Sequence, residues 1–206
     1  MRRTGWTGKH ARVWSAASMC VVMAIVAASD VRAREQRSPS VEYRVLATTK
    51  TSTMEKEMNE AADAGFHFEA AMGGDTAIGG SEVVAVMTRS DNARPRYAYK
   101  LLATSKTSTM QKELQEAADA GFEYRGQTVF KSVFGGEEVV CILERDRNDT
   151  SHRSEYKLLA TTKTSTLQKE LSEIGDQGYV VLGMTVAKTA MGGKEVVAIT
   201  KRERPR

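Results

Sequence analysis

The pattern of apolar and polar positions occurs three times along the chain. Residues 43–89 align without gaps on residues 99–145 and again on residues 156–202, at offsets of 56 and then 57 residues. Polar linkers at 90–96 and 146–154 separate these segments. Self-similarity at a nearly constant spacing is typical of chains built from one repeated supersecondary unit. The sequence therefore predicts three tandem units, which we call repeats 1, 2 and 3.

Each repeat is predicted to contain one strand, one helix and a strand hairpin. Residues 99–104 are rich in strand-forming side chains, and positions 110, 114, 117 and 118 then place apolar side chains on one helical face. A glycine ends the helix, because glycine adopts the left-handed conformation at little cost. A second strand, a Gly-Gly turn and a third strand complete the unit. The helix-ending glycines are Gly65, Gly121 and Gly178.

The start of each predicted helix carries a serine followed three residues later by Glu or Gln. In this capping-box spacing, the serine hydroxyl accepts a hydrogen bond from one free helix N–H, and the Glu or Gln accepts from another. We therefore expect the serine to be the N-cap of each helix. The pairs are Ser52 with Glu55, Ser108 with Gln111, and Ser165 with Gln168.

A single repeat of about 47 residues is too small to build a stable core alone. We therefore expect an α+β fold in which three tandem βαββ repeats pack together, each a small three-stranded sheet with one helix. A pseudo-threefold arrangement of the repeats stays open at this point. In repeat 1, Gly73, Gly74 and Asp75 interrupt the second strand, which we expect to be bulged or cut short.

The first 33 residues have the layout of a secretory signal peptide. Four basic residues precede an uncharged stretch at 13–29, and Val31 and Ala33 occupy the −3 and −1 positions of a cleavage site. The stretch is shorter than the roughly 20 apolar residues that a membrane span requires. We expect residues 1–33 to direct export, so that the protein is periplasmic or secreted. The alternative is an uncleaved signal peptide that anchors the chain, and no other membrane contact is expected.

The net charge of the chain comes from this leader. The chain has 30 Lys and Arg against 26 Asp and Glu, whereas residues 34–206 hold 25 of each. Proteins that bind nucleic acid usually carry a net basic surface. The balanced charge of residues 34–206 therefore argues against nucleic acid as a partner.

Repeat 3 resembles a known bacterial family. It opens with Glu155-Tyr156-Lys157, its helix ends in the segment 171–179, and Lys201-Arg202 close it. The family called domain of unknown function 4177 is similar, with an E-Y-K opening, a helix ending L-x-x-L-G-x-x-G-W and a closing K-R. The resemblance implies a small α+β fold and brings no catalytic residues with it. The family's Trp is replaced in the three repeats by Phe66, Phe122 and Tyr179.

Few residues suited to catalysis or metal binding occur in 34–206. His67 and His152 are the histidines of this region, and neither has a second metal ligand at a suitable spacing. No nucleophile–base set is recognisable, and the glycine pairs do not precede a helix as a phosphate loop requires. Cys141 lies in an apolar strand, where a cysteine most simply fills the core. We therefore expect no metal, no cofactor and no enzymatic activity.

The segment Lys-Thr-Ser-Thr precedes each helix unchanged in all three repeats. A helix N-terminus offers free N–H groups and a partial positive charge, so adjoining hydroxyls and a lysine would suit an anion or a carboxylate. A cap-and-turn role is the simpler interpretation, and both stay open. The candidate ligand-binding residues are Lys50, Thr51, Ser52, Thr53, Lys106, Thr107, Ser108, Thr109, Lys163, Thr164, Ser165 and Thr166.

Export, repetition and the missing catalytic set together predict a non-enzymatic binding or interaction module of the cell envelope. Its expected partner is an envelope component or another protein. One alternative is an enzyme or binding protein for a small anion at the Lys-Thr-Ser-Thr segments. Another is a structural protein that self-assembles through exposed strand edges. Homo-oligomerisation stays open.

Overall fold

The structure is a computed structural model of the chain, in which residues 41–206 form one unit. The structure describes residues 40–76, 80–104, 106–131, 137–149, 153–188 and 193–204. The predicted signal peptide, His152 and most of the predicted Gly-Gly turns lie outside the described residues.

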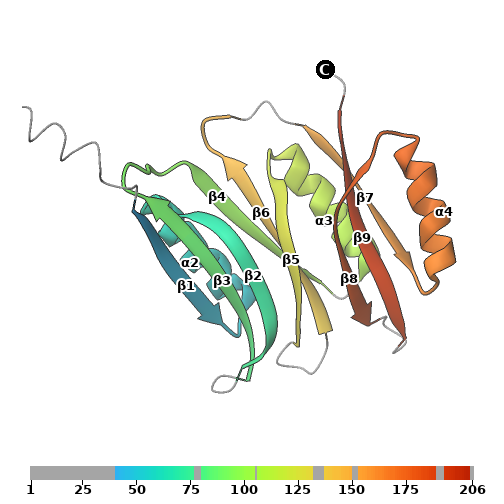
Figure 1. Ribbon diagram of the computed structural model, residues 1–206, viewed down its shortest axis with the longest axis horizontal. Helices are drawn as coiled ribbons and strands as arrows, with labels where there is room; N and C mark the ends of the chain where they lie inside the picture. Colours follow the sequence, from blue (N-terminus) through green and yellow to red (C-terminus); the bar gives the residue numbers. More distant parts are fainter. Residues whose placement is uncertain are drawn as a thin grey trace, which may run out of the picture. The chain divides into compact units, whose positions relative to one another are not determined.

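The described chain has an α+β fold of three repeats, each a small three-stranded antiparallel sheet with one helix (Figure 1). The predicted fold class is confirmed. Repeat 1 contains β1 (Val41–Thr48), α2 (Thr51–Asp63), β2 (His67–Thr76) and β3 (Gly80–Ser90). Repeat 2 contains β4 (Tyr97–Thr104), α3 (Thr107–Asp119), β5 (Glu123–Lys131) and β6 (Glu137–Asp146). Repeat 3 contains β7 (Ser154–Thr161), α4 (Thr164–Gly175), β8 (Val180–Lys188) and β9 (Lys194–Glu203).

The third strand of each repeat is the centre of its sheet. The strand orders are β1-β3-β2, β4-β6-β5 and β7-β9-β8, so the first strand of every repeat is an edge strand. Each second strand has a register shift at the same position, between Phe68 and Ala70 in β2 and at the corresponding residues of β5 and β8. The expected break at the glycines of repeat 1 is wrong. Gly73 and Gly74 pair with Val83 and Glu82 inside an uninterrupted β2, because β3 supplies a partner for each.

The helices end as predicted but begin differently. Gly65, Gly121 and Gly178 have φ of 88°, 83° and 83°. Gly65 N–H donates to the Ala62 carbonyl and Phe66 N–H to the Ala61 carbonyl, which is the Schellman pattern, and repeats 2 and 3 have the same pair of bonds.

The prediction that serine caps each helix is wrong. The N-cap positions are Lys50, Lys106 and Lys163, with no side-chain cap hydrogen bond, and Ser52, Ser108 and Ser165 lie inside the helices. A threonine two residues earlier shapes the turn instead, since Lys106 N–H donates to Thr104 Oγ1 at 3.1 Å. Lys50 N–H and Lys163 N–H donate in the same way to Thr48 Oγ1 and Thr161 Oγ1.

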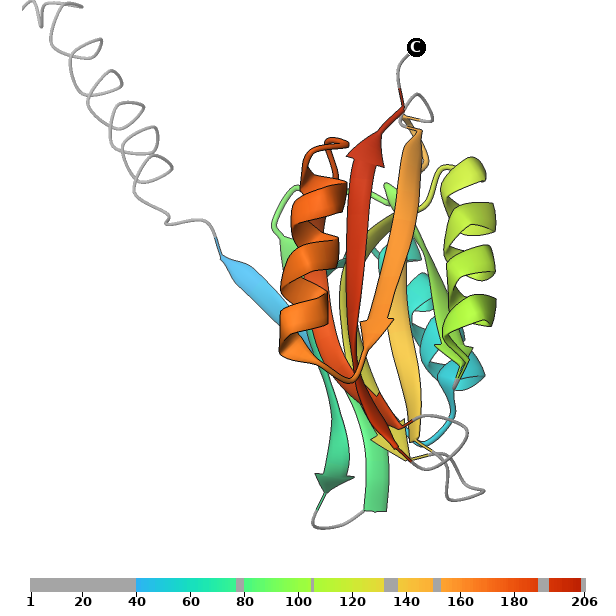
Figure 2. The same ribbon diagram turned by 90° about the vertical axis from the view of Figure 1, so that its right-hand side faces the viewer.

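The repeats stack in series, with repeat 2 in the middle (Figures 1 and 2). We call the face of each sheet that carries its own helix the front face, and the opposite side the back face. The first core joins α2 and the front face of sheet 1 to Tyr99, Leu101, Val140 and Ile142 on the back face of sheet 2. The second core likewise joins α3 and the front of sheet 2 to Tyr156 and Ile199 of sheet 3. This serial stacking replaces the pseudo-threefold arrangement.

The helix of one repeat also covers the edge strand of the next repeat. On α2, Asn59 accepts from Tyr99 N–H at 3.0 Å and donates to the Tyr99 carbonyl at 2.9 Å, while Glu55 accepts from Leu101 N–H at 2.8 Å. Glu55, which the sequence predicted to be part of a capping box, and Asn59 therefore satisfy backbone groups that an edge strand would leave unpaired.

The junction of repeats 2 and 3 is built in the same way. Gln115 accepts from Tyr156 N–H at 3.1 Å, and Gln111 accepts from Leu158 N–H at 2.8 Å. An ion pair at the helix end also recurs. Arg147 contacts Asp63 at 2.8 Å across the first junction, and Arg204 contacts Asp119 at 3.0 Å across the second.

Replacing Gln111 by alanine is expected to lower the free energy of unfolding by about 1–3 kcal/mol, because two backbone groups of β7 lose their partners. Gln168 has the corresponding position on α4, where it bonds Ser172 and is exposed. Gln168→Ala is therefore expected to change stability little. Urea unfolding of both variants tests this, and equal losses would contradict the role given to Gln111.

A second variant at the junction of repeats 2 and 3 is expected to stabilise the protein. Among the described residues, Gln127 has no hydrogen-bond partner for its buried Nε2 and Oε1 atoms. Repeat 3 has Met184 at this position. Gln127→Met is expected to raise the free energy of unfolding by about 1–2 kcal/mol, because an unsatisfied amide is removed. Gln115→Met, which removes an amide that is hydrogen bonded, is expected to lower it. A loss of stability in Gln127→Met would contradict the assignment.

Candidate functional site

The Lys-Thr-Ser-Thr segments lie at the starts of α2, α3 and α4, on three different repeats. Lys50, Lys106 and Lys163 are exposed, as is the serine of each segment. The segments therefore form three separate sites, one for each repeat. The structure assigns their turn to the preceding threonines, and anion binding at these residues stays a prediction from the sequence.

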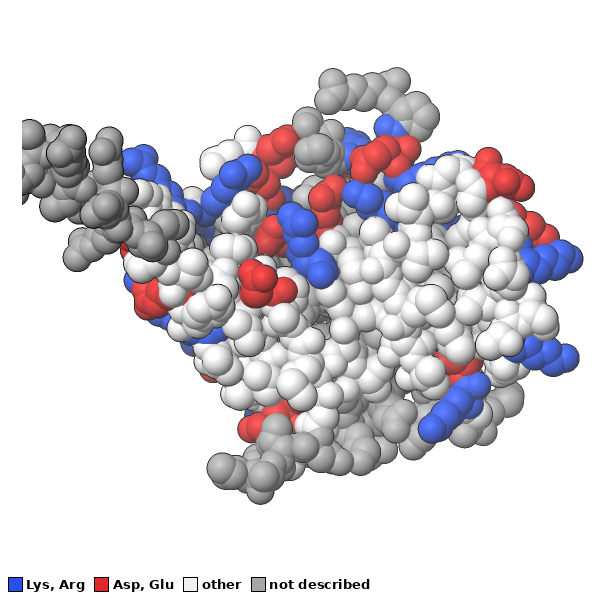
Figure 3. Space-filling view, viewed as in Figure 1, with Lys and Arg blue, Asp and Glu red and all other residues white. Residues whose placement is uncertain are grey.

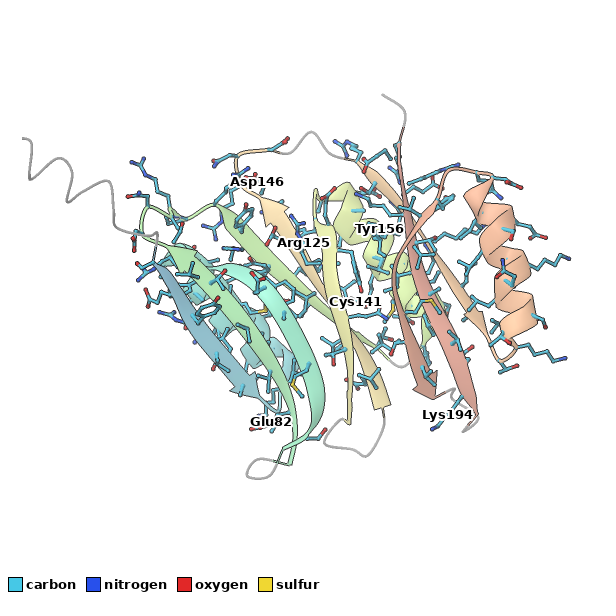
Figure 4. The ribbon with its side chains drawn as sticks, in the orientation of Figure 1. Glu82, Arg125, Cys141, Asp146, Tyr156 and Lys194 are labelled. Carbon is cyan, nitrogen blue, oxygen red and sulfur yellow. The ribbon has the colours of Figure 1, made fainter. Side chains whose placement is uncertain are left out.

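A cavity of about 180 Å³ opens beside β4, β5 and β6 in repeat 2. Its charged side chains are largely paired with one another. Glu144, which is 5% exposed, accepts from Tyr99 Oη at 2.7 Å and from Arg125 Nε at 2.9 Å. Arg96 donates to Asp146 at 2.7 Å and holds the pKa of this carboxyl below its ordinary value. Figure 4 shows Arg125 and Asp146 in this region.

This charged group is a property of repeat 2 alone. The position of Glu144 is occupied by Thr88 in repeat 1 and by Lys201 in repeat 3, where Lys201 contacts Glu123 across the junction at 3.4 Å. Because Glu144 and Asp146 are neutralised by their partners, the cavity presents little uncompensated charge from them to a ligand. We assign the group a structural role.

Several thiol and phenol groups have pKa values that burial raises. Burial raises the pKa of the Cys141 thiol to about 12, and burial also raises the pKa of the Tyr99 and Tyr124 hydroxyls. Cys141 is fully buried in the second core, as the sequence predicts for a core cysteine (Figure 4).

We expect the free energy of unfolding to fall as the pH rises above about 9. The ordinary pKa values are 9.0 for the cysteine and 10.0 for the tyrosines, and folding raises them. The native state therefore keeps its protons longer than the unfolded chain, so stability is full below these values and is lost above them. Urea unfolding between pH 8 and 11 tests this. Tyr124→Phe should reduce the slope above pH 10 by at most about 1.4 kcal/mol per pH unit, and an unchanged slope would contradict it.

The two ends of the stack carry a different kind of candidate site. The back face of sheet 1 has no preceding repeat to cover it, and we call it the N-terminal face. On it Val41, Tyr43 and Val45 of β1 are 50%, 66% and 64% exposed, and Met72 of β2 is also exposed. In repeat 2 the corresponding residues Tyr97, Tyr99 and Leu101 pack into the first core.

The front face of sheet 3 is uncovered beside α4, and we call it the C-terminal face. Val181, Met184 and Val186 of β8 are each about half exposed. Figure 3 shows few charged side chains over β5 and β8. The corresponding residues of repeat 2, Tyr124 and Val129 among them, pack against the second core.

These two faces hold nearly all the exposed large apolar side chains of the described chain, Val180 being the exception. Soluble proteins rarely expose contiguous apolar patches without a binding role. Reasoning from the sequence missed both faces, because it assigned apolar strand positions to the core. The sequence did contain one signal for these faces, namely the position of each repeat in the series, since the first and last repeats each lack one neighbouring repeat.

Comparisons with protein-family models, with curated proteins and with solved structures found no match for this chain. The resemblance of repeat 3 to the bacterial family therefore stays a prediction. In the described residues, no helix is long and apolar enough to cross a membrane. The same residues contain no group of three or more His, Cys, Asp or Glu placed to hold a metal ion.

Proposed function

We propose that this chain is an exported, non-enzymatic interaction module of the cell envelope that binds a protein partner through the apolar faces at the ends of its repeat stack. Export rests on the signal-peptide layout of residues 1–33. The interaction role rests on the N-terminal and C-terminal faces.

One observation carries this proposal. Strand positions that the internal junctions cover are exposed at the ends of the stack. Tyr99 and Tyr156 are each 3% exposed, whereas Tyr43 is 66% exposed; Phe68 and Tyr124 are partly buried, whereas Val181 is 48% exposed. A strand position that buries an aromatic side chain against a neighbouring repeat has the chemistry of an interface core, where aromatic and apolar residues concentrate. An end position that keeps this chemistry is suited to binding a further protein surface.

Site-specific photo-crosslinking in the producing cells tests the proposal. A photoreactive phenylalanine analogue is placed at Val45 on the N-terminal face, at Met184 on the C-terminal face, and at Lys112 on α3. Lys112 serves as the control because its side chain is 79% exposed and lies on neither face. We expect irradiation to give discrete adducts of higher mass from Val45 or Met184 and none from Lys112.

The same samples test export. Cell fractionation is expected to place the chain in the envelope or the medium, with the mass of the protein after removal of about 33 residues. The absence of adducts at both faces would overturn the interaction role. Full-length protein in the cytoplasm would overturn the assignment to the envelope.

A further inference from the structure

We propose that the C-terminal face of one copy of this chain binds the N-terminal face of a second copy, in the arrangement that already joins repeat 1 to repeat 2 and repeat 2 to repeat 3. This inference rests on the proposed function and identifies its partner as the chain itself. The two internal junctions supply the geometry of the contact.

A tyrosine hydroxyl forms the first shared contact of both junctions. Tyr99 Oη accepts from Phe68 N–H at 2.7 Å, and Tyr156 Oη accepts from Tyr124 N–H at 2.8 Å. In each case the donor precedes the register shift of the second strand in the preceding repeat. The corresponding pair at the chain ends is Tyr43 and Val181, which are 66% and 48% exposed. The chain thus presents both members of a third such contact on opposite ends.

The helix that covers the next edge strand supplies the second contact. Glu55 and Gln111 accept from Leu101 N–H and Leu158 N–H. The corresponding residues at the ends are Gln168 on the exposed side of α4 and Val45 on the edge strand β1. A second copy seated on α4 would bring its Val45 N–H to the Gln168 amide and would cover the edge of β1, to which the described residues of one copy pair no further strand.

Apolar complementarity supplies the third contact. Because β2 contacts β5 and β5 contacts β8 at the internal junctions, Val181, Met184 and Val186 would lie against β2 of the second copy, which carries exposed Met72. At the internal junctions, the same positions bring Phe68 against Gly126 and Tyr124 against Gly183. Repeat 1 has Ala70 at the position of these glycines, and Ala70 is exposed and small enough to receive Val181.

Two polar contacts of the internal junctions are also changed at the chain ends, and both changes weaken the contact between copies. Ser172 replaces Asn59 and Gln115 on the helix, and its hydroxyl bonds the Gln168 carbonyl of its own helix. The ion pair at the helix end would become Asp176 facing Asp91, two acidic residues in place of Asp and Arg. We therefore expect association that depends on protein concentration and strengthens as salt screens the two acids.

The contact joins two different surfaces, so it does not close on itself in a dimer. A heterologous contact of this kind produces a ring or an open filament, according to the rotation between successive copies. Association of this chain is therefore expected to continue beyond two copies as the concentration rises.

Sedimentation velocity of the chain expressed from its full sequence tests the proposal. We expect the average mass to rise with concentration. Asp91→Arg restores the internal ion pair and Ser172→Gln restores the helix amide, so each should shift association to concentrations about 2- to 10-fold lower at low ionic strength. Met184→Glu places a charge in the contact and should shift it at least about 10-fold higher. Lys112→Glu, on the exposed side of α3, should leave it unchanged.

Each outcome has a definite meaning. The proposal is overturned if the chain stays monomeric at every concentration with Asp91→Arg and Ser172→Gln also monomeric, or if Met184→Glu associates as the unchanged chain does. Adducts with a different protein at Val45 or Met184 in cells, combined with a monomeric purified chain, would overturn self-association and keep the proposed function. Monomers whose Val45 adducts are intramolecular would also overturn self-association. Circular dichroism of each variant confirms that it is folded.

Discussion

Replacing Ile142 by alanine is expected to lower the free energy of unfolding by about 2–5 kcal/mol. Ile142 is fully buried in the first core, on the back face of sheet 2, where it packs among residues of repeats 1 and 2. The substitution leaves a cavity between two repeats that the surrounding rigid strands fill only in part. Urea unfolding at low protein concentration measures the loss.

Val86 provides the matched control for this prediction. It occupies the position of Ile142 in repeat 1, on the N-terminal face, where it is only partly buried. Val86→Ala is therefore expected to cost less than about 1 kcal/mol in the isolated chain. Similar losses for both variants would mean that the back face of sheet 1 is as well covered as that of sheet 2, which would contradict the serial stacking.

The fold was predictable from the sequence because its main determinants are local. Alternating strands, the apolar face of each helix and the glycines at 65, 121 and 178 all act within a few residues, and they recur three times. Repetition also predicted that the units pack together, because one unit cannot bury enough apolar surface alone.

The junctions were not predictable, because their contacts join residues about 40 positions apart. Glu55 and Gln111 sit at a capping-box spacing, so a local reading assigns them to their own helix. They bond instead to N–H groups on the edge strand of the next repeat. An unpaired N–H group inside the junction costs more free energy than an uncapped helix start, which is exposed to water. A local rule was overridden by a nonlocal hydrogen bond.

The candidate site was missed for a related reason. Tyr43 and Val181 have the same apolar character as Tyr99 and Tyr124, so no property of the residues themselves marks them as surface. Their exposure follows from the direction of stacking, which in the described part of the chain leaves the back of repeat 1 and the front of repeat 3 without a neighbouring repeat. Conversely, the unchanged Lys-Thr-Ser-Thr segments attract attention, although each lies at a separate helix start.

Gly183→Ala is expected to lower the free energy of unfolding by about 1–3 kcal/mol. A Cβ at this position would overlap Tyr124 Oη and lie 3.1 Å from Tyr124 Cζ, so the Tyr124 ring must shift from its place in the second core, or the strands of repeats 2 and 3 must move apart. Tyr124→Phe removes the overlapping oxygen, and the double variant should therefore recover part of the loss in urea unfolding. Gly175→Ala is the control, because nothing lies within 4 Å of its Cβ and alanine favours the helix. A Gly183→Ala variant as stable as Gly175→Ala would show that repeats 2 and 3 are not held in contact at this strand, and the arrangement from which the contact between copies is inferred would lose its support.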